Sequence, residues 1–404
     1  MYRNGDPFFV MGGCILDTLG MAQLAKVGGN TVRTYPEANL DLIMPYADSL
    51  GLGVIVGLNI PPFRKGMDYT DQAAVDSLWQ IIEAQVLRWK NHPALLFWGI
   101  GNELDIRASK KQTKAIFRAV NNFSKKIHHI DDQHPTSYMA NGPTGALKSY
   151  QYCRDLDIIS INTFRSMAQL SKAFHYGGRF INKPVLISEW APSGYWNAAT
   201  TSWGAPIEMN AEEKAYSYGN FYNNFLKEGG RLMLGSCLFL WGQKQEQTHS
   251  WFSYFTEEGE PTALVDKMNH IWTGHPPDNH APLAQVIRVD TFELGSEIFL
   301  EAGKSTYAVG YGKDEDGDHL ISSWEVTEEY QRELSTGGDK EIRPPSIDSL
   351  ILYSSNDTLY FNAPEETGAY RMYYYLRDSH GKAGIVNVPF YVVKPSGLVD
   401  VSQL

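Results

Sequence analysis

The feature that most constrains the fold of this chain is the alternation of short apolar runs with amphipathic segments over its first two thirds. Because the runs lack a polar alternation, they are typical of strands buried on both faces in a parallel sheet. The amphipathic segments, such as 71–90 and 110–130, carry apolar residues at spacings of three and four and predict helices. Eight predicted strands are found, at residues 7–13, 30–35, 53–59, 94–100, 135–140, 157–162, 184–190 and 231–241.

Eight strand-then-helix units predict a (β/α)8 barrel, since closure of the sheet leaves no exposed edge strand. The pattern changes after the stretch HPPDNHAPL at 275–283, where period-two strands follow at short spacing. These strands are punctuated by DG, ND and HG turns, which is typical of an immunoglobulin-like all-β sandwich. The sequence therefore predicts a TIM barrel over residues 1–282 and a C-terminal sandwich over 283–404.

The composition excludes several classes of function. The formal net charge of −11 argues against a nucleic acid or an anionic membrane surface as partner, because both are bound by clustered Lys and Arg. Cys14, Cys153 and Cys237 are widely spaced and form no CxxC pair, so neither a disulfide framework nor a zinc site is indicated. No apolar run approaches the ~20 residues that span a bilayer.

Polar and aromatic residues lie at or just beyond the carboxyl ends of the predicted strands, which is where barrel enzymes carry their active sites. Two of them, Glu103 and Glu189, end the fourth and seventh strands. A carboxylate at the end of an apolar strand is costly to desolvate unless it is hydrogen-bonded or used in chemistry. The other candidates, which we expect to bind substrate, are Arg33, Tyr35, Asn59, Asn102, Asn162, Trp190, Trp241 and Gln243.

Two glutamates that face one cavity from opposite strands suit glycoside hydrolysis with retention, for which a separation of ~5 to 5.5 Å is needed. One carboxylate must be ionised to attack the anomeric carbon, and the other must keep a proton for the leaving oxygen. Arg33 near Glu189 would hold that carboxylate ionised as the nucleophile. Glu103 would then be the acid and base, with Asn102 placed to bond the 2-hydroxyl of the sugar.

The motifs WGIGNELD (98–105) and VLISEWAPSG (185–194) resemble the strand-4 and strand-7 motifs of clan A glycoside hydrolases. GGNTVRTY and LFLWGQKQEQTHSWF (238–252) resemble bacterial barrel proteins grouped with family 2. The strand-2 segment also resembles endo-β-1,3-glucanases and β-1,3-glucanosyltransferases. The resemblance implies the same roles for Glu103, Glu189, Asn102 and Arg33, and makes Trp241 the floor of the −1 subsite.

The chain departs from the clan pattern at the end of the sixth strand. Many clan members place a Tyr there to hydrogen-bond the nucleophile, whereas this chain reads SINTF and offers Asn162 and Phe164. A Tyr from elsewhere would have to substitute, or the hydrogen bond would be absent.

The loop after the seventh strand, APSGYWNAATTSWGAPIE, is long for a βα loop and carries Trp196 and Trp203. Because long loops at a catalytic face usually serve function, we expect these side chains to bind substrate. DEDGD at 314–318 contains calcium-type ligands, but an EF-hand needs a longer loop that ends in Glu, so a tight turn is predicted. No metal or organic cofactor is expected, since two carboxylates suffice.

The favoured hypothesis is a retaining hydrolase of a β-linked glucan, with an endo-cleaved β-1,3-glucan among the candidates. Two alternatives stay open: a transglycosylase that uses the same carboxylates, and a non-catalytic carbohydrate-binding protein on a barrel scaffold. The expected partner is an oligo- or polysaccharide. The first residues lack the features of a signal peptide, which leaves a cytoplasmic location open, but a polymeric substrate favours a secreted or periplasmic protein with its signal removed.

Overall fold

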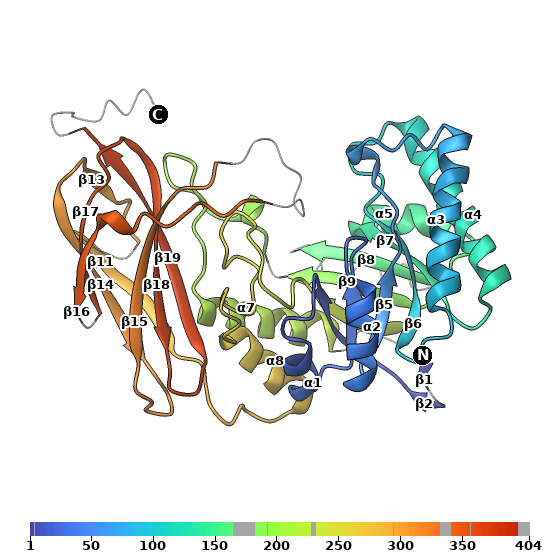
Figure 1. Ribbon diagram of the computed structural model, residues 1–404, viewed down its shortest axis with the longest axis horizontal. Helices are drawn as coiled ribbons and strands as arrows, with labels where there is room; N and C mark the ends of the chain where they lie inside the picture. The colour runs from blue at the N-terminus through green and yellow to red at the C-terminus, as the bar shows by residue number, and fades with distance from the viewer. Residues whose placement is uncertain are drawn as a thin grey trace. The chain divides into compact units, whose positions relative to one another are not determined.

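The computed structural model describes residues 1–3, 5–164, 182–191, 193–227, 232–293, 295–331, 341–355 and 357–394. Contacts between Cα atoms divide the chain into two compact units. The first comprises Met1–Pro192 and Asn220–Gly242, and the second comprises Ser193–Gly219 and Gln243–Leu404. In Figure 1 the first unit contains the blue to green barrel strands and the second contains the orange to red strands.

The first unit is a closed barrel of parallel strands in the order β10-β3-β4-β5-β6-β7-β8-β9. Each of the eight predicted strands is confirmed, and most of their residues are buried, as expected for strands covered on both faces. The bounds are β3 (Val10–Ile15), β4 (Thr31–Thr34), β5 (Gly53–Gly57), β6 (Leu95–Asn102), β7 (Thr136–Asn141), β8 (Ile158–Phe164), β9 (Val185–Ala191) and β10 (Met233–Leu238). A hairpin of β1 (Tyr2–Arg3) and β2 (Asp6–Pro7) precedes the barrel.

The helices that follow barrel strands are amphipathic, and α4 shows how the sequence specifies one. Its N-cap Ser109 accepts a hydrogen bond from the backbone N–H of Gln112 at 3.2 Å. Its buried face, with Ile116, Val120 and Ile127, packs against β6 and β7. The helices are α1 (Met21–Lys26), α2 (Leu40–Ser49), α3 (Gln72–Trp89), α4 (Lys110–Ile130), α5 (Gly142–Tyr152), α7 (Ala211–Phe221) and α8 (Ala263–Thr273).

Short helical turns complete the helical part: η1 (Phe63–Lys65), η2 (Tyr195–Asn197), η3 (Tyr222–Leu226) and η4 (Asp348–Leu350). Within the ranges that the structure describes, no helix has both the length and the apolarity needed to cross a bilayer. Residues 165–181, which follow β8, lie outside those ranges.

The C-terminal strands form two sheets, in the orders β12-β11-β14-β17-β16 and β13-β19-β18-β15. Apolar residues of both sheets, such as Phe361 and Phe390, form one buried core between them, so the predicted sandwich is confirmed. The pairing is antiparallel except between β13 and β19. The bounds are β11 (Leu283–Val289), β12 (Phe292–Glu293), β13 (Phe299–Glu301), β14 (Ser305–Lys313), β15 (Ile321–Glu328), β16 (Ile351–Ser355), β17 (Thr358–Asn362), β18 (Gly368–Arg377) and β19 (Ala383–Val393).

The turns between sandwich strands follow the dipeptides seen in the sequence. Gly317 and Gly381 adopt φ of 81° at the DG and HG turns, a conformation that favours glycine. Asn356 of the ND dipeptide lies outside the described residues. Sandwich strands begin at Leu283, whereas the second compact unit also includes segments that follow β9 and β10 in the chain. The division into domains at residue 282 therefore stays a prediction.

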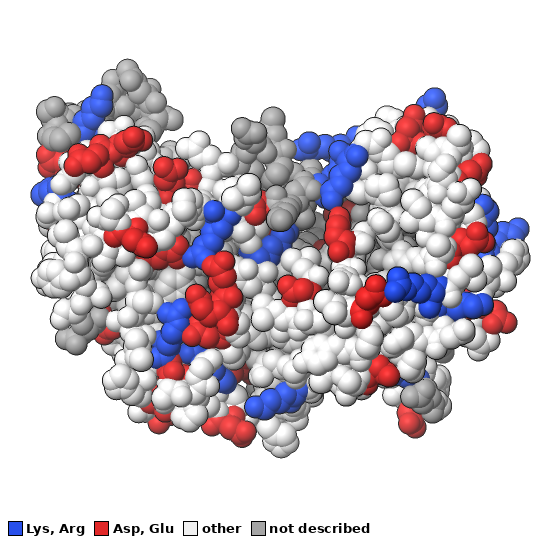
Figure 2. All heavy atoms as spheres, viewed as in Figure 1, with Lys and Arg blue, Asp and Glu red and all other residues white. Residues whose placement is uncertain are grey.

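Charged side chains of both signs are interspersed in small groups over the face shown in Figure 2. The exclusion of a polyanionic partner stays a prediction from the net charge.

Candidate active site

A buried cation connects the ends of three barrel strands. Arg33 of β4, which is 2% exposed, donates from Nη1 to Glu189 Oε1 of β9 at 2.7 Å. It donates from Nη2 to Asn102 Oδ1 of β6, also at 2.7 Å. Burial disfavours the charge of Arg33, but Glu189, Cys14 and Tyr35 together outweigh burial and raise the pKa of the guanidinium above its ordinary value. Arg33 is therefore a permanent cation beside Glu189.

A second donor reaches the same carboxylate oxygen. The hydroxyl of Tyr35, which follows β4 directly, donates to Glu189 Oε1 at 2.9 Å. The guanidinium of Arg33 lies 4.9 Å from the centre of the Tyr35 ring. Glu189 is 5% exposed, so its carboxylate exchanges most of its water for these two donors.

Glu103 is turned into the site by an irregularity at the end of β6. The pairing of β6 with β7 shifts register between Gly99 and Asn102, which is the signature of a β-bulge. Gly101 and Glu103 both have positive φ, at 80° and 49°. A left-handed backbone is costly for a glutamate, and such conformations cluster at functional sites. The backbone N–H of Glu103 donates to Met139 O at 2.9 Å and fixes this conformation.

Asn162 of β8 connects the two halves of the site. Its Nδ2 donates to Glu103 Oε1 and to Asn102 Oδ1, both at 3.0 Å. The buried hydroxyl of Ser188 donates to Asn162 Oδ1 at 2.8 Å, which fixes the orientation of the amide. The two glutamates are thus joined through a chain of hydrogen bonds that runs through Arg33, Asn102 and Asn162.

The surroundings give Glu103 a different charge state from that of a solvated carboxyl. Burial, followed by the charge of Glu189, raises the pKa of Glu103 to about 7, against opposing effects of Asn162, Arg33 and Arg64. At neutral pH the site therefore has a proton to give from Glu103, while Glu189 accepts from a cation and a hydroxyl. Arg64 was not among the predicted residues, because it lies in the turn η1 and not at the end of a strand.

Comparison with known proteins identifies the family of this chain. Residues 17–229, just over half of the chain, match the family model described as glycosyl hydrolases family 2, TIM barrel domain. The chain belongs to glycosyl hydrolase family 2. This confirms the family 2 part of the resemblance seen in the sequence, while the resemblance to endo-β-1,3-glucanases has no support from the comparisons.

Two curated relatives are β-glucuronidases. The human enzyme is 27% identical over 188 residues, which cover 41% of this chain and 26% of that protein. The enzyme of Chlorocebus aethiops is 26% identical over 186 residues, with the same shares. The matched region is therefore about a quarter of the length of these relatives.

Solved structures of β-glucuronidases share the fold of this family 2 chain. Bacteroides uniformis β-glucuronidase 2, covalently bound to cyclophellitol-6-carboxylate aziridine, has a TM-score of 0.52 at 12% identity, over 97% of this chain and 47% of that one. The enzyme of an uncultured Clostridium species has a TM-score of 0.53 at 19% identity, over 67% and 51%. At such identities the likeness concerns the fold alone.

Three residues of the family 2 barrel that were predicted to bind substrate are not part of the hydrogen-bond network described above. Asn59 is exposed after β5, and its backbone N–H donates to Gln85. Trp190 is fully buried and stacks on Phe221 at 5.1 Å, because successive side chains of a strand point to opposite faces. Trp241 is also fully buried, and its Nε1 donates to a backbone oxygen at 2.9 Å. A role in substrate binding stays a prediction for all three.

The remaining predicted residues belong to the second compact unit. Trp196 is 48% exposed and packs edge-on against Tyr195 at 4.8 Å. Trp203 packs against Phe299 of the sandwich at 5.3 Å. The Gln243 amide donates to a backbone oxygen of the loop that follows β10. Of these side chains, Trp196 is the exposed one, and a role in substrate binding stays a prediction for all three.

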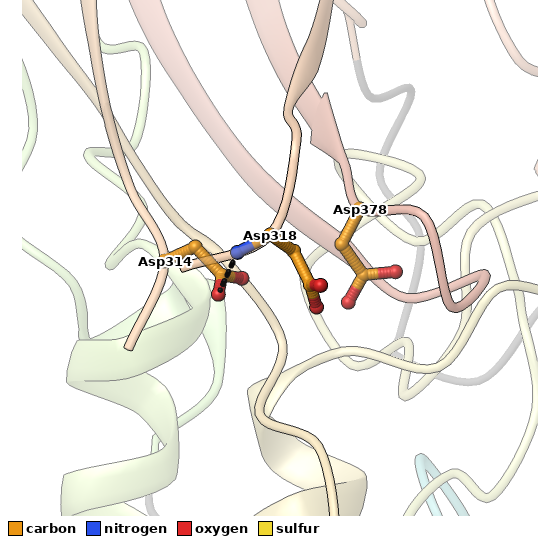
Figure 3. A group of neighbouring side chains, drawn as sticks. All are labelled: Asp314, Asp318 and Asp378. Atoms are coloured by element: carbon orange, nitrogen blue, oxygen red, sulfur yellow. Dashed lines mark hydrogen bonds between the residues drawn. The ribbon is translucent and has the colours of Figure 1, made fainter. Parts of the chain in front are cut away.

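The acidic segment 314–318 forms the connection between β14 and β15, as predicted. Asp314, Asp318 and Asp378 place carboxylate oxygens within 4.8 Å of one another (Figure 3). The carboxylate of Asp314 accepts a hydrogen bond from the backbone N–H of Asp318 at 3.0 Å. The carboxylate of Asp318 lies 2.9 Å from the ring nitrogen Nδ1 of His380. These bonds brace two neighbouring loops, so we assign no metal to the group.

Proposed function

We propose that this chain carries the active site of a retaining β-glycosidase in which Glu189 is the nucleophile and Glu103 is the general acid and base. The observation that carries the proposal is the contrast between the two carboxyl groups. Glu189 accepts hydrogen bonds from the cation Arg33 and from the hydroxyl of Tyr35, as suits a carboxylate nucleophile. Glu103 has a pKa raised to about 7, which favours its protonated form.

These two residues suffice for both chemical steps, formation and hydrolysis of the glycosyl-enzyme. In the first, an electron pair of the Glu189 carboxylate forms a bond to the anomeric carbon, the bond to the aglycone oxygen breaks, and that oxygen takes the proton of Glu103. In the second, the Glu103 carboxylate removes a proton from water, the water oxygen attacks the anomeric carbon, and Glu189 leaves as a carboxylate.

Asn102 is proposed to bind the 2-hydroxyl of the reacting sugar. Its Oδ1 already accepts from Arg33 and Asn162, so the amide nitrogen is the group left to meet a substrate. A hydrogen bond to the 2-hydroxyl that strengthens as the anomeric carbon becomes positive lowers the barrier in both steps.

For the substrate we propose a β-glucuronide as the first class to test, in place of the β-glucan expected from the sequence. The support is that the relatives named above are β-glucuronidases and that none of them is a glucanase. The charges of both Arg33 and Arg64 act on Glu103, and a second cation near the acid suits an anionic sugar.

The experiment combines a panel of substrates with a covalent label. Aryl β-glycosides of glucuronic acid, glucose, galactose and mannose are incubated with the protein, and NMR follows the first anomer released. A 2-deoxy-2-fluoro analogue of the sugar that reacts is then used to trap the glycosyl-enzyme. We expect the β-anomer first and a label on the peptide that contains Glu189, with no label in E189Q.

Two results would refute the proposal. Release of the α-anomer first would show inversion, and a label on another residue would show a different nucleophile. Tight binding of oligosaccharide with no turnover of any glycoside would instead favour a carbohydrate-binding protein.

A further inference from the structure

The clan pattern places a tyrosine at the end of β8, where this chain has Asn162 and Phe164. Neither of these two side chains carries a hydroxyl. The amide of Asn162 is engaged with Glu103 and Asn102. Phe164 packs edge-on against Phe239, with ring centres 5.3 Å apart. Among the described residues, the hydroxyl that donates to Glu189 belongs to Tyr35, which follows β4.

Tyr35 supplies this donor from β4, on the other side of the nucleophile. Its hydroxyl lies 2.9 Å from Glu189 Oε1, and the oxygen also accepts from Arg33 at 2.7 Å. The two donors come from residues two apart on the same chain segment, and the cation lies over the ring of the tyrosine. Arg33 and Tyr35 thus form one unit that holds one oxygen of the carboxylate.

We propose that Tyr35 is a positioning residue that, together with Arg33, holds Oε1 of Glu189 so that Oε2 is the oxygen that attacks the anomeric carbon. The inference rests on the proposed function, because it assigns the attacking atom of the proposed nucleophile. It moves Tyr35 from the substrate-binding group, where the sequence placed it, to the support of the nucleophile.

The arrangement also acts on the second step. In the glycosyl-enzyme, Oε2 is the ester oxygen and Oε1 is the carbonyl oxygen. When water displaces the sugar, the electron pair of the bond between the anomeric carbon and Oε2 returns to the carboxylate, and negative charge develops on both oxygens. Tyr35 and Arg33 stabilise the share on Oε1, so they assist departure of the nucleophile as well.

Tyr35 keeps its proton throughout this cycle. Burial, together with the charges of neighbouring groups such as Cys14 and Glu189, raises the pKa of its hydroxyl well above the ordinary value. The residue therefore acts as a neutral donor and not as a proton carrier.

The test compares Y35F with Y69F, using the aryl β-glycoside that reacts fastest in the panel above. Tyr69 is a matched control, because it is a buried tyrosine of the same unit whose hydroxyl donates to a backbone oxygen at 2.6 Å. A hydrogen bond to a charged group corresponds to a loss of about 10- to 100-fold in kcat/KM for Y35F. We expect kcat to fall as well, since the second step is also affected.

The split between kcat and KM distinguishes a positioning role from a loss of structure. An interaction that acts in the transition state lowers kcat and kcat/KM together, so Y35F should lose kcat at a nearly unchanged KM, while Y69F should keep both values. A Y35F variant with the wild-type kcat and kcat/KM would overturn the inference. Failure of the wild type to be labelled at Glu189 would instead overturn the proposed function.

A second measurement does not depend on the folding of any variant. A crystal structure of the trapped wild-type glycosyl-enzyme should show the ester bond at Oε2, with Oε1 within hydrogen-bonding distance of Tyr35 and Arg33. An ester bond at Oε1, or a Tyr35 hydroxyl directed at the sugar and away from Glu189, would contradict the inference.

Discussion

Replacement of Glu103 by Gln is expected to increase the stability of the protein relative to the wild type as the pH rises. The folded protein keeps the proton of Glu103 up to about pH 7, because burial and the charge of Glu189 raise its pKa. The unfolded chain loses that proton near its ordinary value of 4.5. The contribution of Glu103 to the free energy of unfolding is thus fully present below about pH 4.5 and is lost as the pH rises through about 7.

The magnitude follows from the two pKa values. At ~1.4 kcal/mol for each pKa unit, a pKa raised from 4.5 to about 7 corresponds to about 3 kcal/mol in total. Between pH 5 and pH 8, and allowing for partial exposure of the carboxyl, the expected change is about 2 kcal/mol. E103Q lacks this titration, so the free energy of unfolding of E103Q minus that of the wild type should increase by this amount from pH 5 to pH 8.

Urea unfolding followed by tryptophan fluorescence at the two pH values measures this difference, and titrating groups that do not interact with Glu103 cancel in it. E37Q is the control, because Glu37 is a glutamate of the same unit whose side chain is 71% exposed. Its effect on the free energy of unfolding should be small and equal at both pH values. A gap between E103Q and the wild type that is the same at pH 5 and pH 8 would refute the reasoning.

Three other changes test neighbouring parts of the structure. E103Q should slow aryl glycosides with poor leaving groups by about 10²- to 10⁴-fold and those with good leaving groups much less, which steady-state kinetics on a leaving-group series will measure. R371M should lower the free energy of unfolding in urea by about 3 to 5 kcal/mol, because the buried carboxylate of Glu329 loses its bidentate hydrogen bonds from Arg371. G101A should lower the stability by about 1 to 3 kcal/mol and should also lower the activity. Gly101 has a φ of 80°, and a Cβ at this position would lie 2.7 Å from Leu104 Cδ1. Thermal unfolding and kinetics on one sample check this.

The fold could be predicted from periodicity, because burial on both faces leaves a direct mark on the sequence. The limits of the strands were less well predicted. The last barrel strand was expected to run from 231 to 241, whereas β10 ends at Leu238. Phe239, Leu240 and Trp241 are 6%, 1% and 0% exposed although they lie beyond the ladder. Apolar sequence marks burial, and burial extends past the last strand residue, together with single backbone hydrogen bonds such as that from Trp241 N–H to Cys14 O at 2.8 Å.

Part of the candidate site could be predicted from the sequence. Glu103 and Glu189 could be found because a carboxylate at the end of an apolar run stands out in the sequence alone. The role of Tyr35 could not, since a bond between residues 35 and 189 depends on the closure of the barrel. Arg64 was missed because its turn carries no strand-end signal.

The guanidinium of Arg33 makes the surroundings of the two glutamates different. Both carboxyl groups are largely removed from water, and each disfavours the charge of the other. Arg33 breaks this symmetry, because its two terminal nitrogens reach Glu189 and Asn102 and leave Glu103 to an amide donor. A cation stabilises a buried carboxylate far more than a neutral amide does. The charge of Glu189 in turn helps to keep the proton on Glu103.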